Sequence, residues 1–164
     1  MPKCQFTTQY YDYEISDDIH FCCPEEPLAS GFCIFHDEDY LHDKINNDEH
    51  KRKVLNRLKR KVNHAISNNE SLLCIGFQLP DFIPSDLGII NKEFTKPVYF
   101  SSSKFFGKAS FHRANFKEIA IFYEAEFRGQ SIFYDAKFQG EADFSKTDFQ
   151  THVGFNNSEF YGKT

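Results

Sequence analysis

Phenylalanine recurs through the later part of the chain in steps that alternate strictly between five and six residues. The positions are Phe100, Phe105, Phe111, Phe116, Phe122, Phe127, Phe133, Phe138, Phe144, Phe149, Phe155 and Phe160. A small residue stands two places before each, at Val98, Ser103, Ala109, Ala114, Ala120, Ala125, Ser131, Ala136, Ala142, Thr147, Val153 or Ser158. On an α-helix a five-residue step turns about 500°, which would scatter the rings around the cylinder. In an extended chain residues two apart share a face, so the pattern predicts short strands that turn both side chains inward.

Glycine marks some of the corners between these strands. It lies two places after a phenylalanine, always within a six-residue step, at Gly107, Gly129, Gly140 and Gly162. We expect glycine there because the longer corner needs backbone conformations that other residues avoid. Glu118 and Thr151 occupy the two remaining corners of this kind, so glycine is favoured but not obligatory.

A fixed period of this kind is typical of a solenoid, whose units bury their apolar faces only by stacking on their neighbours. From about Val98 to Thr164 the chain resembles a pentapeptide-repeat protein, with copies such as Ala109-Ser110-Phe111 and Ala125-Glu126-Phe127. The resemblance implies a right-handed, four-sided parallel β-helix with one short repeat on each side. The twelve units would then form about three coils, spaced by the ordinary strand separation of roughly 4.8 Å.

The chain departs from the usual pattern of that family, which has leucine at the centre of each repeat and strict five-residue steps. Phenylalanine throughout and the alternating steps imply a coil of about 22 residues. In this interpretation Phe100, Phe122 and Phe144 stack in one ladder. The next ladder is formed by Phe105, Phe127 and Phe149.

The basic stretch before the repeats predicts one amphipathic α-helix. Asn46, with Glu49 three residues later, suits a capping box at its start. One face carries apolar residues at helical spacing, namely Leu55, Leu58, Val62, Ala65 and Ile66. Lysines and arginines occupy the remaining surface. We expect this helix to pack on the solenoid, with contact to nucleic acid or to an anionic membrane as the alternative.

The chain therefore divides into three parts, with mainly β structure overall. Residues 1–43 form an acidic segment that contains cysteine and histidine, and residues 44–97 a basic helix and connector that cap the solenoid. Residues 98–164 form the β-helix. The first part has ten acidic residues against one lysine, whereas the repeats carry eight charges of each sign. The net charge of −5 is a sum of opposed segments and says little about partners.

Four of the five cysteines lie in the first 33 residues. Cys33 and His36 form a Cys-x-x-His pair, which can place a thiolate and an imidazole on the same ion. Thiolates from Cys4 and Cys23 would complete the tetrahedral set that structural zinc prefers. Because this segment has few apolar residues, we predict a structural zinc ion bound by these four side chains. A full set of protein ligands leaves no open position for a substrate.

Other interpretations of the cysteines stay open. Cys22 is a rival of Cys23, which we favour because Cys23-Pro24 suits a turn, and His20 is a weaker rival ligand. Plain reduced cysteines and disulfides are the alternatives to a metal. The odd number of cysteines and the lack of a secretory signal argue against disulfides. Cys74 is expected to be an ordinary core residue.

The sequence contains no recognisable enzyme motif, and we predict a non-enzymatic interaction or scaffold module. Outward residues such as Tyr99, Ile121 and Tyr123 could form an apolar contact surface on one side of the solenoid. The family resemblance suggests an alternative, a DNA-mimicking regulator of a topoisomerase. Mimicry requires rows of outward carboxylates, whereas the outward positions here are mixed in charge. Nucleic-acid binding through the basic helix is a further alternative.

The expected partner is another protein rather than a membrane or a nucleic acid. No apolar stretch is long enough for secretion or for a membrane span, so we expect a cytoplasmic protein. No polar cap follows Phe160, although solenoids normally need one. Either the chain is a piece of a longer protein, or two copies join end to end as a homodimer through the last coil.

Overall fold

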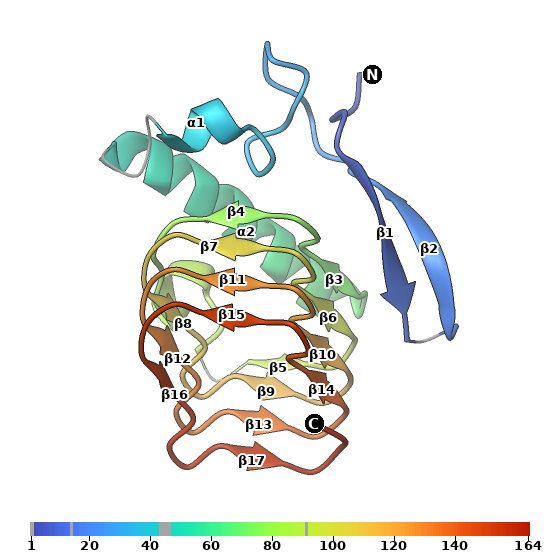
Figure 1. The fold of residues 1–164 in the computed structure, drawn as a ribbon, viewed down its shortest axis with the longest axis vertical. Helices are drawn as coiled ribbons and strands as arrows, with labels where there is room; N and C mark the ends of the chain where they lie inside the picture. The colour runs from blue at the N-terminus through green and yellow to red at the C-terminus, as the bar shows by residue number, and fades with distance from the viewer. Residues whose placement is uncertain (1, 14, 43–46, 91) are drawn as a thin grey trace.

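The computed structural model describes residues 2–13, 15–42, 47–90 and 92–164 (Figure 1). It is mainly β, as expected, and most of it is a four-sided stack of very short parallel strands. In chain order the elements are β1 (Thr7–Asp12), β2 (Asp17–Cys22), α1 (Glu38–His42), α2 (Asp48–Asn68), β3 (Leu72–Leu73), β4 (Gln78–Leu79), α3 (Pro84–Leu87), β5 (Glu93–Phe94), β6 (Val98–Tyr99), β7 (Lys104–Phe105), β8 (Ala109–Ser110), β9 (Asn115–Phe116), β10 (Ala120–Ile121), β11 (Glu126–Phe127), β12 (Ser131–Ile132), β13 (Lys137–Phe138), β14 (Ala142–Asp143), β15 (Asp148–Phe149), β16 (Val153–Gly154) and β17 (Glu159–Phe160).

Each side of the solenoid is one parallel sheet built from strands of successive coils. The strand orders are β14-β10-β6-β3, β15-β11-β7-β4, β16-β12-β8 and β17-β13-β9-β5. Ala120 pairs with Val98 on one side and with Ala142 on the other, so the register advances by 22 residues per coil. This confirms the coil length that the alternating steps imply.

The phenylalanine rings fill the interior in the predicted ladders. Phe105 and Phe127 stack with centroids 4.2 Å apart, and Phe122 and Phe144 with centroids 4.9 Å apart. The eight rings from Phe100 to Phe138 are at most 2% exposed. In the last coil the burial falls, and Phe160 is 38% exposed. The core is therefore continuous along the solenoid and opens at its carboxyl-terminal end.

The solenoid begins one coil earlier than the repeats, and it has about four turns. Strands β3, β4 and β5 pair with β6, β7 and β9, so part of the expected connector forms the first coil. On one side of this coil a large inward residue takes the place of a small one. Phe82 bridges to Ala109, and a ring thus occupies a place that later coils give to a small residue. Because of this departure, the pattern of a small residue two places before phenylalanine does not extend to the first coil.

The structure gives a different reason for the glycines at the corners of the coils than the one we expected. Residues with positive φ stand at the five-residue corners, with φ between 54° and 58°, at Ser102, Arg113, Glu124, Asp135, Lys146 and Asn157. The glycines of the six-residue corners are not among the residues with positive φ. A Cβ added at Gly129 would instead lie 2.3 Å from the carbonyl carbon of Gly107 in the preceding coil. Glycine is needed there because successive backbones approach too closely for a side chain.

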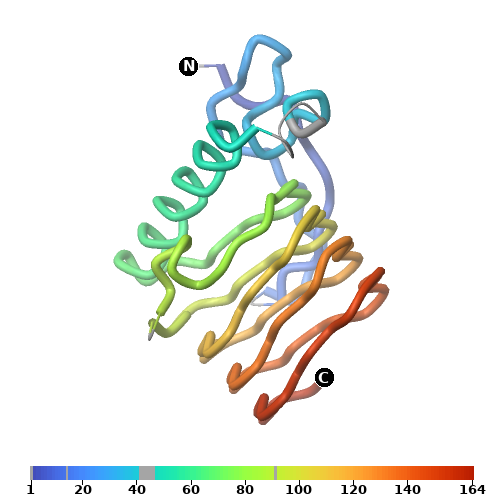
Figure 2. The backbone as a smooth tube through the Cα atoms, turned by 90° about the vertical axis from the view of Figure 1, so that its left-hand side faces the viewer, coloured from blue at the N-terminus to red at the C-terminus, as the bar shows by residue number. Residues whose placement is uncertain are grey.

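Helix α2 covers the open side of the first coil (Figures 1 and 2), which confirms the predicted amphipathic helix. Its fully buried face is Val54, Leu58, Val62 and Ala65, whereas the expected Leu55 and Ile66 are half-buried beside it. The side chain of Asn47 caps the helix by accepting hydrogen bonds from the backbone N–H groups of Glu49 and His50. Asn46, which we expected in this role, and the expected boundary between residues 43 and 44 lie outside the described residues.

A hairpin that the sequence did not predict runs along one side of the solenoid (Figure 1). Its strands β1 and β2 pair antiparallel, and the ring of Tyr10 lies 5.3 Å from that of Tyr99. The Tyr13 hydroxyl donates a hydrogen bond of 2.7 Å to Asp143 in the third repeat coil. Tyr99 and Ile121 are each 1% exposed. Contrary to our expectation, these two residues are not available as a surface for a partner, because the hairpin covers this side.

Among the described residues, no helix has both the length and the apolar character needed to cross a membrane.

Candidate metal centre

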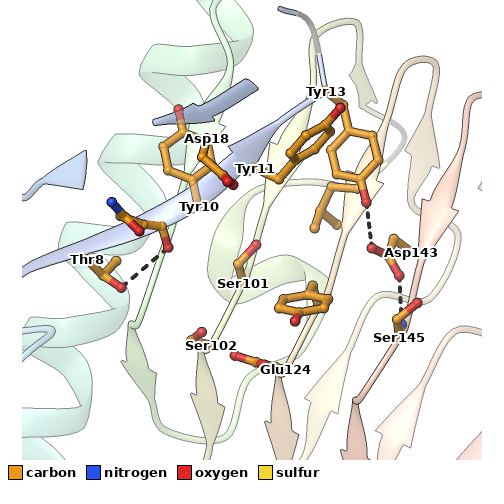
Figure 3. A pocket seen from close by; sticks show the side chains of 13 residues that line it. Thr8, Tyr10, Tyr11, Tyr13, Asp18, Ser101, Ser102, Glu124, Asp143 and Ser145 are labelled. Atoms are coloured by element: carbon orange, nitrogen blue, oxygen red, sulfur yellow. Dashed lines mark hydrogen bonds between the residues drawn. The ribbon is translucent and has the colours of Figure 1, made fainter. Parts of the chain in front are cut away.

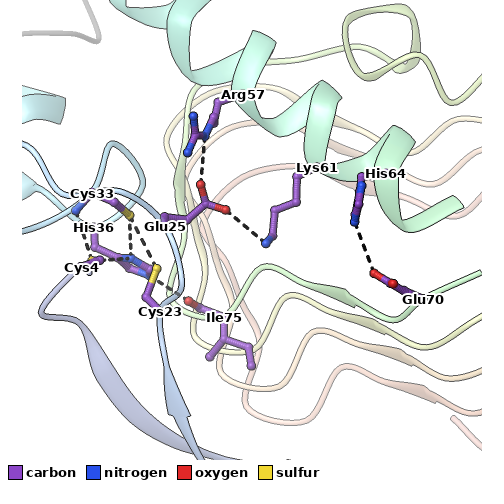
Figure 4. A network of polar contacts seen from close by, with 10 residues as sticks. All are labelled: Cys4, Cys23, Glu25, Cys33, His36, Arg57, Lys61, His64, Glu70 and Ile75. Carbon is purple, nitrogen blue, oxygen red and sulfur yellow. Dashed lines mark hydrogen bonds and ion pairs between the residues drawn. The ribbon is translucent and has the colours of Figure 1, made fainter. Parts of the chain in front are cut away.

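Four side chains singled out by the sequence converge at one buried point beside the first coil (Figure 4): Cys4, Cys23, Cys33 and His36. Their donor atoms all lie within 4.8 Å of one another. Cys33 Sγ lies 3.2 Å from His36 Nδ1 and 3.8 Å from Cys23 Sγ, and Cys4 Sγ lies 3.6 Å from His36 Nδ1. None of the four is more than 6% exposed. They are close enough to hold a metal ion.

The hairpin and a tight turn bring these side chains together. Cys4 precedes β1 and Cys23 follows β2, so the antiparallel pairing places both at the same end of the hairpin. The backbone N–H groups of His36 and Asp37 donate to the carbonyl of Cys33, which closes the turn that carries the other two donors. Asp37 then caps α1 by accepting a hydrogen bond from the backbone N–H of Tyr40.

The imidazole of His36 is oriented from several directions. Its Nε2 lies 3.0 Å from the carbonyl oxygen of Ile75, so Nε2 carries the hydrogen that this acceptor requires. The other nitrogen, Nδ1, then directs its lone pair toward the sulfur atoms of Cys33 and Cys4. The ring of Phe6 stacks on the imidazole at 3.8 Å, and Phe77 meets it edge-on at 5.3 Å. The tautomer and the ring plane are thereby set for binding through Nδ1.

The sulfur atoms differ in their hydrogen bonds. Cys4 Sγ accepts from the backbone N–H groups of Cys33 and Phe6, which favour a thiolate. Burial nevertheless raises the pKa of the Cys4 thiol. The hydrogen bond with Cys23, together with burial, raises the pKa of the Cys33 thiol to about 12. Without a cation the Cys4 and Cys33 thiols stay protonated at neutral pH, so a metal ion would have to displace those protons on binding.

The centre is joined both to the first coil and to helix α2. The ring of Phe35 stacks on Phe77 at 4.1 Å, and its carbonyl accepts a hydrogen bond from the backbone N–H of Gln78 in β4. Glu25, two residues after Cys23, accepts from Arg57 Nε at 2.9 Å and from Lys61 Nζ at 3.3 Å (Figure 4). The donors therefore sit where the amino-terminal segment, the helix and the solenoid meet.

The rival residues lie elsewhere. Cys22 is exposed, and neither Cys22 nor His20 belongs to the cluster. Cys74 is fully buried in the core, where burial raises the pKa of its thiol to about 12. The cysteines are free in the structure, and the Cys23–Cys33 sulfur separation of 3.8 Å is far longer than a disulfide bond.

Sequence reasoning missed the groups around the four donors. Ile75 acts through its carbonyl oxygen, and no residue type signals such a role. Phe6 packs on the imidazole from a segment whose strands we did not predict. Residues 7–13 are rich in threonine and tyrosine, which favour strands, and this composition could have indicated β1.

Comparison with known proteins adds one finding. The family model described as "Pentapeptide repeats (9 copies)" matches residues 93–136 and 122–164. No curated protein and no solved structure matches the chain. The matched residues include the phenylalanine ladders and the strands from β5 to β17 that carry them. Residues 93–164, which form the repeat coils of the solenoid, are therefore pentapeptide repeats.

Proposed function

We propose that this protein is a non-catalytic interaction module, a β-solenoid that binds another protein and whose amino-terminal cap is held by a structural zinc ion. One observation carries the proposal. Three sulfur atoms and one imidazole nitrogen form a closed, buried set of four donors at the joint between cap and solenoid. A site of this kind holds segments together and leaves no coordination position for a substrate.

The spacing of the donors fits zinc. Bonds of about 2.3 Å to sulfur and about 2.0 Å to nitrogen, at tetrahedral angles, separate two sulfur atoms by about 3.8 Å and a sulfur from a nitrogen by about 3.5 Å. The Cys23–Cys33 separation is 3.8 Å, and the Cys4–His36 and Cys33–His36 separations, at 3.6 and 3.2 Å, lie on either side of the sulfur–nitrogen value. Softer thiolate donors together with one imidazole favour zinc over calcium or magnesium, which take oxygen ligands.

The position of the site explains what the metal would stabilise. Cys4 and Cys23 lie at the open end of the hairpin, and the turn from Cys33 to His36 packs on the first coil. The ion would thus fix the amino-terminal segment against the end of the solenoid. Solenoids need such a cover because their terminal coils otherwise expose backbone groups and apolar side chains.

The faces of the solenoid support protein binding better than mimicry of DNA. One face carries Lys104, Glu126 and Asp148 in register, and another carries Asn115, Lys137 and Glu159. A duplex presents an unbroken row of negative charges, and neither face does so. Surfaces of mixed charge are compatible with a protein partner.

The basic helix is partly neutralised within the chain. Lys51 pairs with Asp81, and Lys53 pairs with Glu49, both at 2.8 Å. Arg57 and Lys61 share Glu25. We therefore expect no strong binding of DNA or RNA, and a titration at several salt concentrations measures this directly, since phosphate contacts make affinity steeply salt-dependent.

The zinc proposal predicts a metal content and a loss of stability. Protein purified without added metal should contain about one zinc per chain by elemental analysis, since one set of donors is present. Removal of the metal by a chelator should lower the melting temperature, because binding energy at a structural site is folding energy. Cys33→Ala should abolish zinc binding.

Cys22→Ser is the matched control for Cys33→Ala. It removes a neighbouring thiol that is exposed and outside the cluster, so zinc content and melting temperature should stay unchanged. Native protein that contains no metal, or that melts identically before and after chelation, would contradict the proposal.

A further inference from the structure

A cleft of about 510 Å³ lies between the hairpin and the side of the solenoid formed by β6, β10 and β14 (Figure 3). This is the size range of small-ligand sites. Two hydrogen bonds join the hairpin to this side of the solenoid. The Tyr13 hydroxyl donates to Asp143, and the Tyr99 hydroxyl donates to Asp12. The cleft is thus a part of the fold and belongs to neither the metal centre nor the phenylalanine core.

Aromatic rings form much of its lining. Tyr10, Tyr11 and Tyr13 come from the hairpin and Tyr123 from the solenoid. The rings of Tyr11 and Tyr13 meet edge-on with centroids 4.9 Å apart. The faces of such rings attract cations through their quadrupole.

The charged groups that line the cleft all have the same sign. They are Asp18, Glu124 and Asp143, and no lysine or arginine is among the lining residues. Asp143 is engaged with Tyr13 and with the backbone N–H of Ser145. Asp18 makes no ion pair within the described part of the chain. The lining therefore carries a negative charge that the cleft itself does not neutralise.

Ser101 supplies an independent sign of a ligand. This residue is only 6% exposed, yet its hydroxyl forms no hydrogen bond with any described residue. Figure 3 shows the side chain pointing from the solenoid into the cleft. The hydroxyl is reached from the cleft and is free to accept a hydrogen bond from a group that enters it.

The solenoid wall already binds a cation of its own. Lys146 Nζ donates a hydrogen bond to the Tyr123 hydroxyl, lies 3.0 Å from Glu124 Oε1 and is 4.8 Å from the centroid of the Tyr123 ring. Lys146 is not one of the lining residues, and its side chain is 65% exposed. Tyr123 and Glu124 thus form a binding site for an ammonium group at the edge of the cleft.

We propose that this cleft binds an alkylammonium or guanidinium group. The cation lies between the tyrosine rings, donates to the Ser101 hydroxyl and is neutralised by Asp18 and Glu124. The source of the group is either a lysine or arginine side chain of a partner protein or a free amine. The proposal goes beyond the zinc-stabilised interaction role and requires only the hairpin and the solenoid as they stand.

The test uses the purified protein with its metal, labelled with ¹⁵N. Nα-acetyl-lysine methylamide and Nα-acetyl-arginine methylamide are the cationic probes, and Nα-acetyl-norleucine methylamide is the neutral control of similar shape. The cationic probes should shift the backbone amide signals of Ser101, Ser102 and Ser145 with a Kd of about 1 mM, as expected for ligands of this size. The norleucine probe should leave these signals unchanged.

Single substitutions test whether the cationic probes bind in this cleft or associate weakly with the protein surface elsewhere. Asp18→Asn should weaken binding of the lysine probe about threefold or more, by loss of a partly screened charge. Asp148→Asn, on another side of the solenoid, is the control and should have no effect. Lys146→Met should strengthen binding about threefold, because it frees Tyr123 and Glu124 from the internal cation. A merely structural role of Lys146 would not raise the affinity.

Equal shifts with the norleucine probe, or no saturable shifts with either cationic probe, overturn the proposal, as does an unchanged affinity in both Asp18→Asn and Lys146→Met. Two further ligands distinguish the sources. Tighter binding of the peptide Ala-Ala-Lys-Ala-Ala than of the lysine probe supports a protein partner, and tighter binding of putrescine supports a free amine. Zinc content measured on the same samples keeps this result separate from that of the metal proposal.

Discussion

At the scale of single residues, each coil contains two kinds of corner with opposite requirements. The five-residue corners are β-turns in which the third residue has positive φ, as for Arg113, whose φ is 58°. Side chains are present there although the conformation is strained for them. The six-residue corners have ordinary φ and instead bring two backbones together. The same period thus places strain at one corner and steric exclusion at the next.

This difference predicts the effect of two substitutions. Gly129→Ala should destabilise the protein by about 1–3 kcal/mol, because its Cβ would lie 2.3 Å from the backbone of Gly107 and the coils would have to separate. Arg113→Gly should change stability by less than about 1 kcal/mol, since relief of the positive φ offsets the greater freedom of the unfolded chain. Denaturant unfolding monitored by circular dichroism measures both. A harmless Gly129→Ala would show that close approach does not explain these glycines.

At the scale of the elements, strands of two residues are stable only because every coil repeats the same inward pair. Phe127 in β11 is fully buried and stacks between Phe105 at 4.2 Å and Phe149 at 5.0 Å. Its neighbour Glu126 faces outward and pairs with Arg128. The two residues of this strand point to opposite sides of the sheet, so they contribute very different amounts to stability.

Phe127→Ala should lower the free energy of unfolding by about 3–5 kcal/mol, as for other buried phenylalanines. Glu126→Ala is the matched control and should cost at most about 1 kcal/mol, because it removes a surface ion pair with Arg128 and a surface hydrogen bond from Gln150. The comparison requires equilibrium unfolding of both variants under one set of conditions. Similar losses from the two substitutions would mean that the inward and outward register of β11 is wrong.

Some elements could be predicted from sequence and others could not, for identifiable reasons. The repeat strands follow from the phenylalanine period, because each copy repeats the same local rule. The first coil breaks that rule by placing Phe82 where later coils have a small residue. The ligands Cys33 and His36 were visible as a local pair, whereas the carbonyl of Ile75 is brought to His36 only by the folded chain. The types of residues in a sequence do not indicate which backbone groups meet across long distances in the chain.

At the scale of the whole molecule, the two ends of the solenoid differ. The first coil is covered by helix α2 and by the segment around the metal centre. At the other end β14, β15, β16 and β17 are the outermost strands of their sheets. Tyr161 is 68% exposed there, and Phe144, Phe149 and Phe155 are only half-buried. Free strand edges beside exposed rings form a surface suited to association.

We therefore expect two copies of a protein consisting of residues 1–164 to join end to end through the last coil at high concentration. Sedimentation velocity over a range of concentrations should show a monomer–dimer equilibrium. Phe160→Lys should shift that equilibrium to the monomer, because it places a charge where rings would meet. Ile90→Lys is the control, since Ile90 is 58% exposed in the first coil, at the other end of the solenoid, and the dimer should persist. A protein that stays monomeric at every concentration, or a dimer that survives Phe160→Lys and dissociates with Ile90→Lys, would rule out association through this coil.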